Sequence, residues 1–137
     1  MNTLRTAGPG DEITVAGHDG HITAVERYRS PALSFDIWYT RYAAAPGPAL
    51  VVLVEGQAYA ADVVEGAPST EPSGPEHAVR GSAQFERFDG RRRRFGRSRF
   101  TYLTDGSAIE MVLEQAGKQT RLQGQRLPEG SLEHYPA

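Results

Sequence analysis

The sequence predicts an all-β fold, an antiparallel barrel or sandwich with at most one short helix. Stretches rich in Val, Ile, Tyr, Phe and Thr recur along the chain, and many alternate apolar with polar residues. Dipeptides that favour tight turns separate these stretches. No window carries a long apolar stripe of helical period, and a helix beginning at residues 111–115 would meet Gly117 at once.

The individual strands are predicted from the residues between turn signals. These signals are Asp19-Gly20, Glu55-Gly56, Asp89-Gly90 and Asp105-Gly106. Asp-Gly suits a type I′ hairpin turn, because Gly accepts positive φ freely and Asp accepts it moderately. The expected strands are 12–16, 21–29, 35–44, 49–55, 57–64, 79–88, 91–103, 108–115 and 118–125.

A chain of 137 residues is expected to form a single domain, 1–137. Its only low-complexity piece lies at 66–78, where three prolines and small polar residues predict a mobile loop. On either side, 11–65 and 79–127 are interpreted as two related β-meanders. A shift of sixty residues aligns Glu26-Arg27-Tyr28 with Glu86-Arg87-Phe88, Phe35 with Phe95, Tyr42 with Tyr102, and Val52-Leu53 with Val112-Leu113.

The composition excludes several kinds of chemistry. The chain has no cysteine, which removes disulfides, thiolate nucleophiles, iron–sulfur clusters and cysteine zinc sites. Gly8-Pro9-Gly10 lacks the lysine and the helix of a phosphate-binding loop, and no serine lies in a nucleophile elbow. We therefore expect no cofactor and no enzymatic activity. Without a secretory signal or an apolar run that could cross a bilayer, a cytoplasmic protein is expected, with no membrane insertion.

Positive charge is concentrated in one segment of an otherwise acidic chain. Residues 80–99 hold eight of the fifteen Lys and Arg residues against Glu86 and Asp89, a net charge of +6. This leaves −8 on the remainder of a chain whose net charge is −2. The candidate binding residues here are Arg91, Arg92, Arg93, Arg94, Phe95, Arg97 and Arg99.

Three roles are open for this segment. Guanidinium groups interleaved with rings suit a phosphate backbone and stacked bases. An acidic protein, or the second subunit of a homodimer, would neutralise the same arginines. Arginines also protect an exposed edge strand from aggregation.

Strand alternation predicts how the segment is oriented. One face carries Arg91, Arg93, Phe95, Arg97 and Arg99, and the other carries Arg92, Arg94, Ser98, Phe100 and Tyr102. Both faces begin charged, so the four consecutive arginines are expected to project beyond the core as the end of a hairpin. Gly96 is interpreted as a bulge, and Phe95 and Tyr102 are expected to serve the core.

Two further candidate sites carry less specific patterns. Trp38 and Tyr42 share one face of the strand at 35–44, where they pack in the core or line a small-ligand pocket inside the barrel. If Asp19-Gly20 forms a turn, His18 and His21 face each other as weak metal candidates, without the third ligand that such a site needs.

The chain also resembles a bacterial family catalogued as domain of unknown function 4178. The likeness spans nearly the whole chain and rests on Gly10-Asp11-Glu12-Ile13-Thr14-Val15, Gly17, Tyr28, Trp38, Tyr42, Gly81-Ser82-Ala83, Asp89-Gly90, Tyr102, Glu114, Gly124 and Leu132-Glu133-His134-Tyr135-Pro136. The chain departs from the family at Arg41, where members place an acidic residue, and in its arginine run. The resemblance implies an all-β bacterial module with no established chemistry.

The function expected from the sequence is that of a non-enzymatic protein-interaction module, with a protein partner or a homodimer. The first alternative is a nucleic-acid-binding protein that uses the strand from Arg91 to Arg99. The second is a small-ligand-binding barrel.

Overall fold

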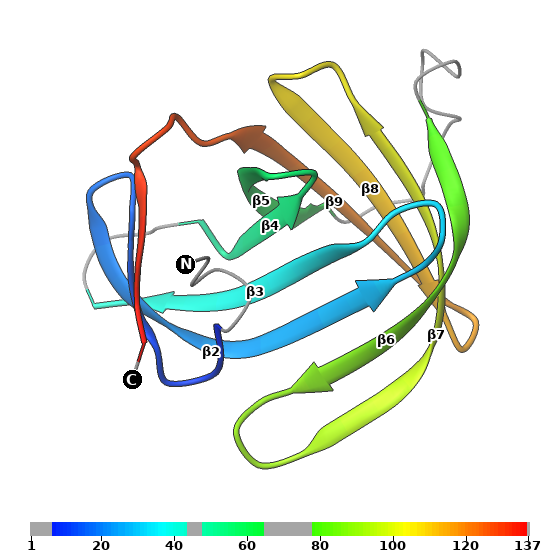
Figure 1. The fold of residues 1–137 in the computed structure, drawn as a ribbon, viewed down its shortest axis with the longest axis horizontal. Coiled ribbons are helices and arrows are strands. Elements are labelled where there is room, and N and C mark those ends of the chain that lie inside the picture. Colours follow the sequence, from blue (N-terminus) through cyan, green and yellow to red (C-terminus); the bar gives the residue numbers. More distant parts are fainter. Residues whose placement is uncertain (1–6, 44–47, 65–77, 137) are drawn as a thin grey trace.

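A computed structural model describes residues 7–43, 48–64 and 78–136, and these form ten β-strands and no helix (Figure 1). The strands are β1 (Glu12–Val15), β2 (His18–Arg29), β3 (Phe35–Tyr42), β4 (Leu50–Val54), β5 (Gln57–Val64), β6 (Val79–Phe88), β7 (Arg93–Thr104), β8 (Ala108–Gln115), β9 (Lys118–Arg126) and β10 (Leu132–Tyr135). The all-β prediction is confirmed. No helix in the described ranges could span a membrane.

Eight of the strands form a closed antiparallel barrel. Hydrogen bonding runs in the order β2-β3-β4-β5-β9-β8-β7-β6, and β6 pairs back onto β2. The chain therefore consists of two four-stranded meanders that meet at two seams, β2–β6 and β5–β9. Because the sheet closes on itself, the fold is the predicted barrel and not the predicted sandwich. Closure also leaves few unpaired strand edges.

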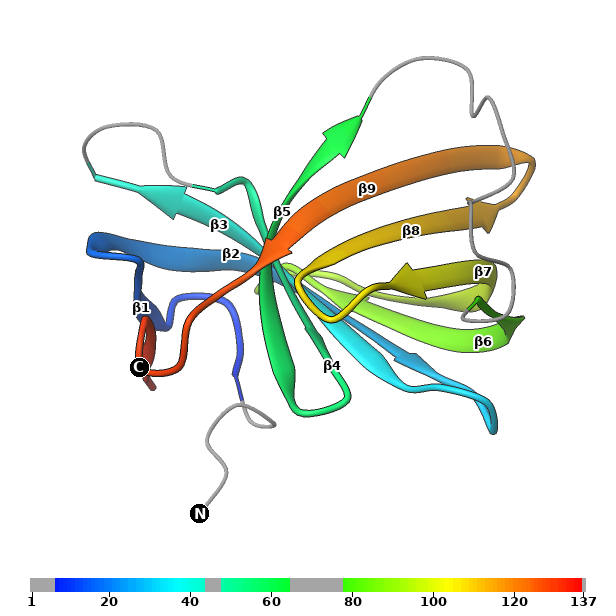
Figure 2. The ribbon, with the colours of Figure 1, turned by 90° about the horizontal axis from the view of Figure 1, so that it is seen from above.

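The two remaining strands flank the barrel. β2 is long enough to have two neighbours on one edge: β1 pairs with its first residues, and β6 pairs with Val25 to Arg29. β10 pairs with the outer edge of β1, and Figure 2 shows these two strands together at one side of the barrel. The sequence did not predict β10 as a strand, although it contains residues of the family resemblance.

Strand alternation divides the apolar side chains between two clusters. The larger cluster fills the barrel interior with residues from all eight barrel strands, including Tyr28, Phe35 and Met111. The second cluster lies on the outer face of β2–β4, beneath β1 and the N-terminal segment, and includes Ile13, Val15, Ile22, Val25, Trp38 and Val51. The same strands are thus buried on both faces.

The predicted turn at Asp19-Gly20 is wrong. The β1–β2 turn is Ala16-Gly17, with φ values of 49° and 85°, and Gly20 lies within β2 opposite Tyr42. A Cβ at Gly20 would lie 2.5 Å from the Arg41 carbonyl oxygen and 2.6 Å from the Tyr42 ring. Glycine is therefore required there for close approach of β3, not for a turn. The other three predicted turns connect adjacent strands as expected.

The residue alignment between the two halves is also wrong, although each half is a meander. Phe35 is buried in the barrel interior with 2% exposure, whereas its predicted counterpart Phe95 is 72% exposed. Side chains alternate along a strand, so this mismatch extends to the neighbouring residues. A shift of sixty residues aligns side chains that point into the barrel with side chains that point out of it. The turns Glu55-Gly56 and Ala116-Gly117, both left-handed, correspond when the shift is one residue larger. The predicted loop at 66–78 lies outside the described residues, except for Ala78.

Gly124 of β9 provides a test of the β5–β9 seam. A Cβ there would lie 2.5 Å from the Ala60 carbonyl oxygen and 2.8 Å from the Ala61 Cβ, both held by β5. We predict that Gly124→Ala lowers the free energy of unfolding by about 1–3 kcal/mol, as overpacking does. Gly8→Ala, where a Cβ meets nothing within 4 Å, is the matched control. Equal urea midpoints for the two variants would contradict the prediction.

Candidate functional site

The arginine-rich segment forms the end of the β6–β7 hairpin. The two strands pair in continuous register from Val79↔Tyr102 to Phe88↔Arg93. In the connecting turn, Asp89 Oδ1 accepts hydrogen bonds from the backbone N–H groups of Arg91 and Arg92, each at 2.9 Å. These bonds lower the pKa of Asp89 and fix the turn.

Gly96 is not a bulge, contrary to the prediction. It pairs directly with Phe85, and a Cβ at Gly96 would lie 2.8 Å from the Phe85 ring. The missing side chain makes room for this ring, which also stacks on Tyr28 with a centroid separation of 5.7 Å. The alternation along β7 is therefore unbroken from Arg93 onward, as the regular pattern predicted.

One edge of β7 is unpaired where the hairpin projects. The ladder between β7 and β8 begins at Arg99↔Glu114, because β8 ends at Gln115. Arg93 to Ser98 pair with β6 on one side and with no described strand on the other. Figure 1 shows the β6–β7 turn lying well away from the β8–β9 turn. The predicted projection of the hairpin is confirmed, and its consequence is a free strand edge.

The arginines of the segment divide into two groups. Three are paired with carboxylates: Arg87 with Glu26 at 2.8 Å, Arg93 with Glu86 at 2.5 Å, and Arg99 with Glu114 at 3.8 Å. Within the described part of the chain, the guanidinium groups of the other five have no such partner, and all five residues are exposed: Arg80 near the start of β6, and Arg91, Arg92, Arg94 and Arg97 at the hairpin end.

The rings of the segment also differ in their surroundings. Tyr102 is 2% exposed in the barrel interior, as expected, but Phe95 is 72% exposed, so its predicted core role is wrong. Phe95 lies on the outward face of β7, between Arg93 and Arg97. The Arg93 guanidinium is 4.3 Å from the centroid of Phe88 and is thus held by both a carboxylate and a ring.

The sequence analysis did not identify a polar network that lies inside the barrel. Glu26, only 7% exposed, accepts hydrogen bonds from Arg87 at 2.8 Å, Tyr28 at 2.8 Å and Tyr39 at 3.2 Å. Gln115 donates to the Tyr28 hydroxyl at 3.0 Å, and the Arg87 guanidinium lies 4.6 Å from the Tyr39 ring centroid. A detectable signal was present, since strand alternation places Glu26 on the same face as the core residue Tyr28.

The electrostatics of this network indicate a structural role. Burial, followed by the nearby Glu26 carboxylate, raises the pKa of Tyr28 well above its usual range and raises the pKa of Tyr39 to about 12. Both phenols therefore remain neutral donors. The Glu26 carboxylate is satisfied by three donors, which is the condition under which a buried charge is tolerated.

Trp38 and Tyr42 do not face the barrel interior. Trp38 is fully buried in the second cluster, with its ring centroid 5.4 Å from that of His134. His134 Nε2 is in turn 2.7 Å from Asp11 Oδ2, which ties β10 to the segment before β1. Tyr42 packs against the same cluster. These aromatic residues hold the flanking strands against the barrel, and Tyr42 also lines an open pocket of about 560 Å³ beside β1, outside the barrel interior.

His18 and His21 are not opposed across a turn, because both lie in β2. Their spacing of three residues places them on opposite faces of the strand. In the described ranges no three residues of the types His, Cys, Asp and Glu come together in a way that could hold a metal ion.

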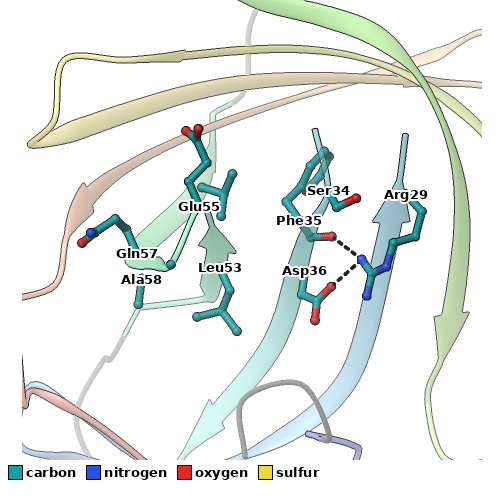
Figure 3. A pocket seen from close by; sticks show the side chains of 10 residues that line it. Arg29, Ser34, Phe35, Asp36, Leu53, Glu55, Gln57 and Ala58 are labelled. Atoms are coloured by element: carbon teal, nitrogen blue, oxygen red, sulfur yellow. Dashed lines mark hydrogen bonds and ion pairs between the residues drawn. The ribbon is translucent and has the colours of Figure 1, made fainter. Parts of the chain in front are cut away.

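A pocket of about 530 Å³ lies on the outer face of the barrel, at the ends of β3, β4 and β5 (Figure 3). Its buried carboxylate, Asp36, is held by Arg29 at 3.0 Å and lies 3.9 Å from Arg27. Arg29 also donates to the Phe35 carbonyl oxygen at 3.5 Å. Asp36 is thus neutralised within the pocket, whereas the Glu55 side chain at its rim is exposed and has no cationic partner among the described residues.

Comparison with known proteins adds no constraint on this site. No protein-family model, curated protein or solved structure matches the chain. The resemblance to domain of unknown function 4178 therefore stays a prediction. The unpaired edge of β7 and the turn before it, with Arg91, Arg92, Arg94, Arg97 and Phe95, are the candidate functional site.

The Glu26–Arg87 pair can be tested by removing one partner. We predict that Arg87→Leu destabilises the protein by about 3 kcal/mol, because it leaves a buried carboxylate without its cation. Arg93→Leu breaks a pair whose side chains are 52% and 28% exposed, so it should cost about 1 kcal/mol or less. The double variant Arg87→Leu/Glu26→Gln should recover most of the lost free energy of unfolding, because it no longer buries an unpaired carboxylate. Equal urea midpoints for the two single variants would refute a buried-pair role.

Alkaline pH provides a second test of the network. The pKa of Tyr39 is raised from 10.0 to about 12 in the folded state, so the unfolded state releases this proton first. Stability from this group is complete below pH 10 and is lost as the pH rises towards 12. We predict that Tyr39→Phe lowers stability at neutral pH and flattens the decline above pH 10. Urea midpoints measured from neutral pH to above pH 10 report both effects. An equally steep decline of stability with pH in Tyr39→Phe and in the unaltered protein would contradict a raised pKa of Tyr39.

Proposed function

We propose that this protein is a non-enzymatic interaction module that binds a partner protein through the β6–β7 hairpin. The observation that supports this best is the combination of an unpaired strand edge and four arginines without carboxylate partners. Several arginines elsewhere on the sheet are paired, as with Arg27 and Arg29 beside Asp36, or Arg121 beside Glu110. Four cations without a carboxylate partner among the described residues thus lie together at the hairpin end, beside the unpaired edge of β7.

The charge distribution supports a directional interaction. Residues 80–99 carry +6 and the remainder of the chain carries −8. An acidic partner is attracted to the hairpin and repelled by the rest of the surface, so the encounter is oriented before contact. The same distribution weakens general adhesion to polyanions, because most of the molecule repels them.

Nucleic-acid binding is a second candidate, favoured by the exposed ring of Phe95. A ring flanked by free guanidinium groups is suited to stacking on an unpaired base. The proposal of a protein partner has the additional support of the free strand edge, whose alternating N–H and C=O groups match the backbone of another polypeptide strand.

A small-ligand function has less support. The barrel interior is occupied by one continuous cluster of side chains that includes Tyr28, Phe35, Tyr59, Phe100 and Tyr102. The pocket in Figure 3 lies on the outer face, where Arg29 already neutralises Asp36.

Matched double variants test the proposal. Arg94→Ala/Arg97→Ala removes two free hairpin cations, and Arg41→Ala/Arg126→Ala removes two exposed cations elsewhere, with the same change in net charge. In capture experiments with nuclease-treated extracts of the cells that make this protein, we predict at least about tenfold less of a specific protein on the hairpin variant than on the control. High salt should release this protein.

Two outcomes would argue against the proposal. Identical captured proteins on both double variants would show that the hairpin is not the binding surface. Material that is retained from untreated extracts but not from nuclease-treated ones, with no captured protein remaining, would favour the nucleic-acid alternative.

A further inference from the structure

We propose that the free edge of β7 binds an extended acidic segment of the partner as an added β-strand. This inference rests on the proposed function and names the partner class for the same site. Strand addition uses the backbone of an exposed edge for affinity and the side chains beside it for specificity. Between Arg93 and Ser98, β7 has both a backbone edge without a described neighbour and exposed side chains beside it.

The hydrogen-bond pattern identifies which backbone groups are available. In an antiparallel ladder, hydrogen-bonded and non-hydrogen-bonded pairs alternate. The Asp89 N–H donates to the Arg92 carbonyl oxygen at the turn, so the alternation makes Arg94 and Gly96 the residues bonded to β6. The N–H and C=O groups of Arg93, Phe95 and Arg97 then point to the free edge. The hydrogen bond from the Asp105 N–H to the Ala108 carbonyl oxygen at the next turn leads to the same assignment. Counted back from it, the odd-numbered residues of β7 direct their backbone groups to the β8 side.

The edge has the shape that an added strand requires. The pairing of β7 with β6 continues without a register shift, and the segment contains no proline. The six residues from Arg93 to Ser98 span about 20 Å at ~3.3 Å per residue, enough for a strand of ordinary length. Natural edges are commonly blocked by bulges, proline or a covering segment. Here charge is the only such device among the described residues.

The side chains beside the edge specify acidic residues in the added strand. Arg97 lies on the outward face and Arg94 on the inward face, both exposed and without a carboxylate partner among the described residues. Opposite charges on directly opposed strand residues are stabilising. Phe95 lies between them and is 72% exposed, which favours one apolar residue in the centre of the partner segment.

A second copy of this chain is a poor occupant of the edge. Antiparallel pairing of two β7 edges over Arg93 to Arg97 would place Arg93 of each copy opposite Arg97 of the other. Like charges directly opposed across strands are destabilising. The feature that attracts an acidic segment thus excludes self-association through the same edge, which argues against a homodimer formed here.

Amide hydrogen exchange of the intact protein tests the inference directly. The probe is a short synthetic peptide that alternates glutamate with valine, and the control is its lysine analogue. We predict that the glutamate peptide slows exchange of the Arg93, Phe95 and Arg97 amides by about tenfold or more, with little change at Arg94 and Gly96. The lysine peptide should leave all five unchanged.

Two substitutions at one position separate the backbone from the side chain. Phe95→Ala removes the ring but keeps the outward N–H, whereas Phe95→Pro removes both, and proline is tolerated where the N–H faces solvent. We predict that Phe95→Pro binds the glutamate peptide at least about tenfold more weakly than Phe95→Ala. Exchange data on the unaltered protein remain decisive if the proline variant is poorly folded.

The failures of the two proposals are distinguishable. Peptide binding without slower exchange at Arg93, Phe95 and Arg97, or equal affinities of the two Phe95 variants, would overturn strand addition and leave the arginine-dependent interaction standing. Tighter binding of oligothymidylate than of the peptide at equal salt would overturn strand addition in favour of nucleic acid. If the capture experiment yields no protein whose retention depends on the hairpin arginines, the proposed function itself is overturned.

Discussion

The structure depends on the ion pair between Glu26 and Arg87 at the seam where the barrel closes. The two residues are direct neighbours in the register of β2 and β6, and both side chains face the interior. Breaking such a buried pair is costly, so it specifies which residue of β6 lies opposite which residue of β2. That choice sets the position of the whole β6–β7 hairpin, because the register of β7 follows from that of β6.

Closure at this seam also explains why a free edge exists. β6 pairs with β2 along Gln84 to Phe88, so its second edge is occupied there. The first residues of β2 extend beyond this ladder and pair with β1. β8 ends at Gln115, so its ladder with β7 reaches only as far as Arg99. The first six residues of β7, Arg93 to Ser98, therefore have no neighbour on that side among the described strands. The barrel is closed around its apolar interior but not along the full length of its strands. The exposed edge is a consequence of unequal strand lengths, and its residues decide whether it is a liability or a binding site.

Strand alternation and turn chemistry were sufficient to predict the all-β class, most strand positions and the projection of the arginine hairpin. They failed where a residue's role depends on a distant strand. Gly20 and Gly96 resembled a turn and a bulge, yet both make room for an aromatic ring from a neighbouring strand. The division of the arginines into paired and free groups depends on Glu26, far from Arg87 in sequence. β10 has a short, largely polar sequence and becomes a strand only because β1 presents an edge to it.

The free arginines can both protect the edge of β7 and select what binds to it. An edge protected by charge repels any strand that carries the same charge, including a second copy of the hairpin. It remains open to a strand of opposite charge, because the backbone groups of Arg93, Phe95 and Arg97 are not blocked by a bulge or by proline. Protection by a covering segment would have excluded all partners equally. In the proposed strand addition, the same arginines repel strands of like charge and attract acidic ones, so protection of the edge and its specificity have one physical cause.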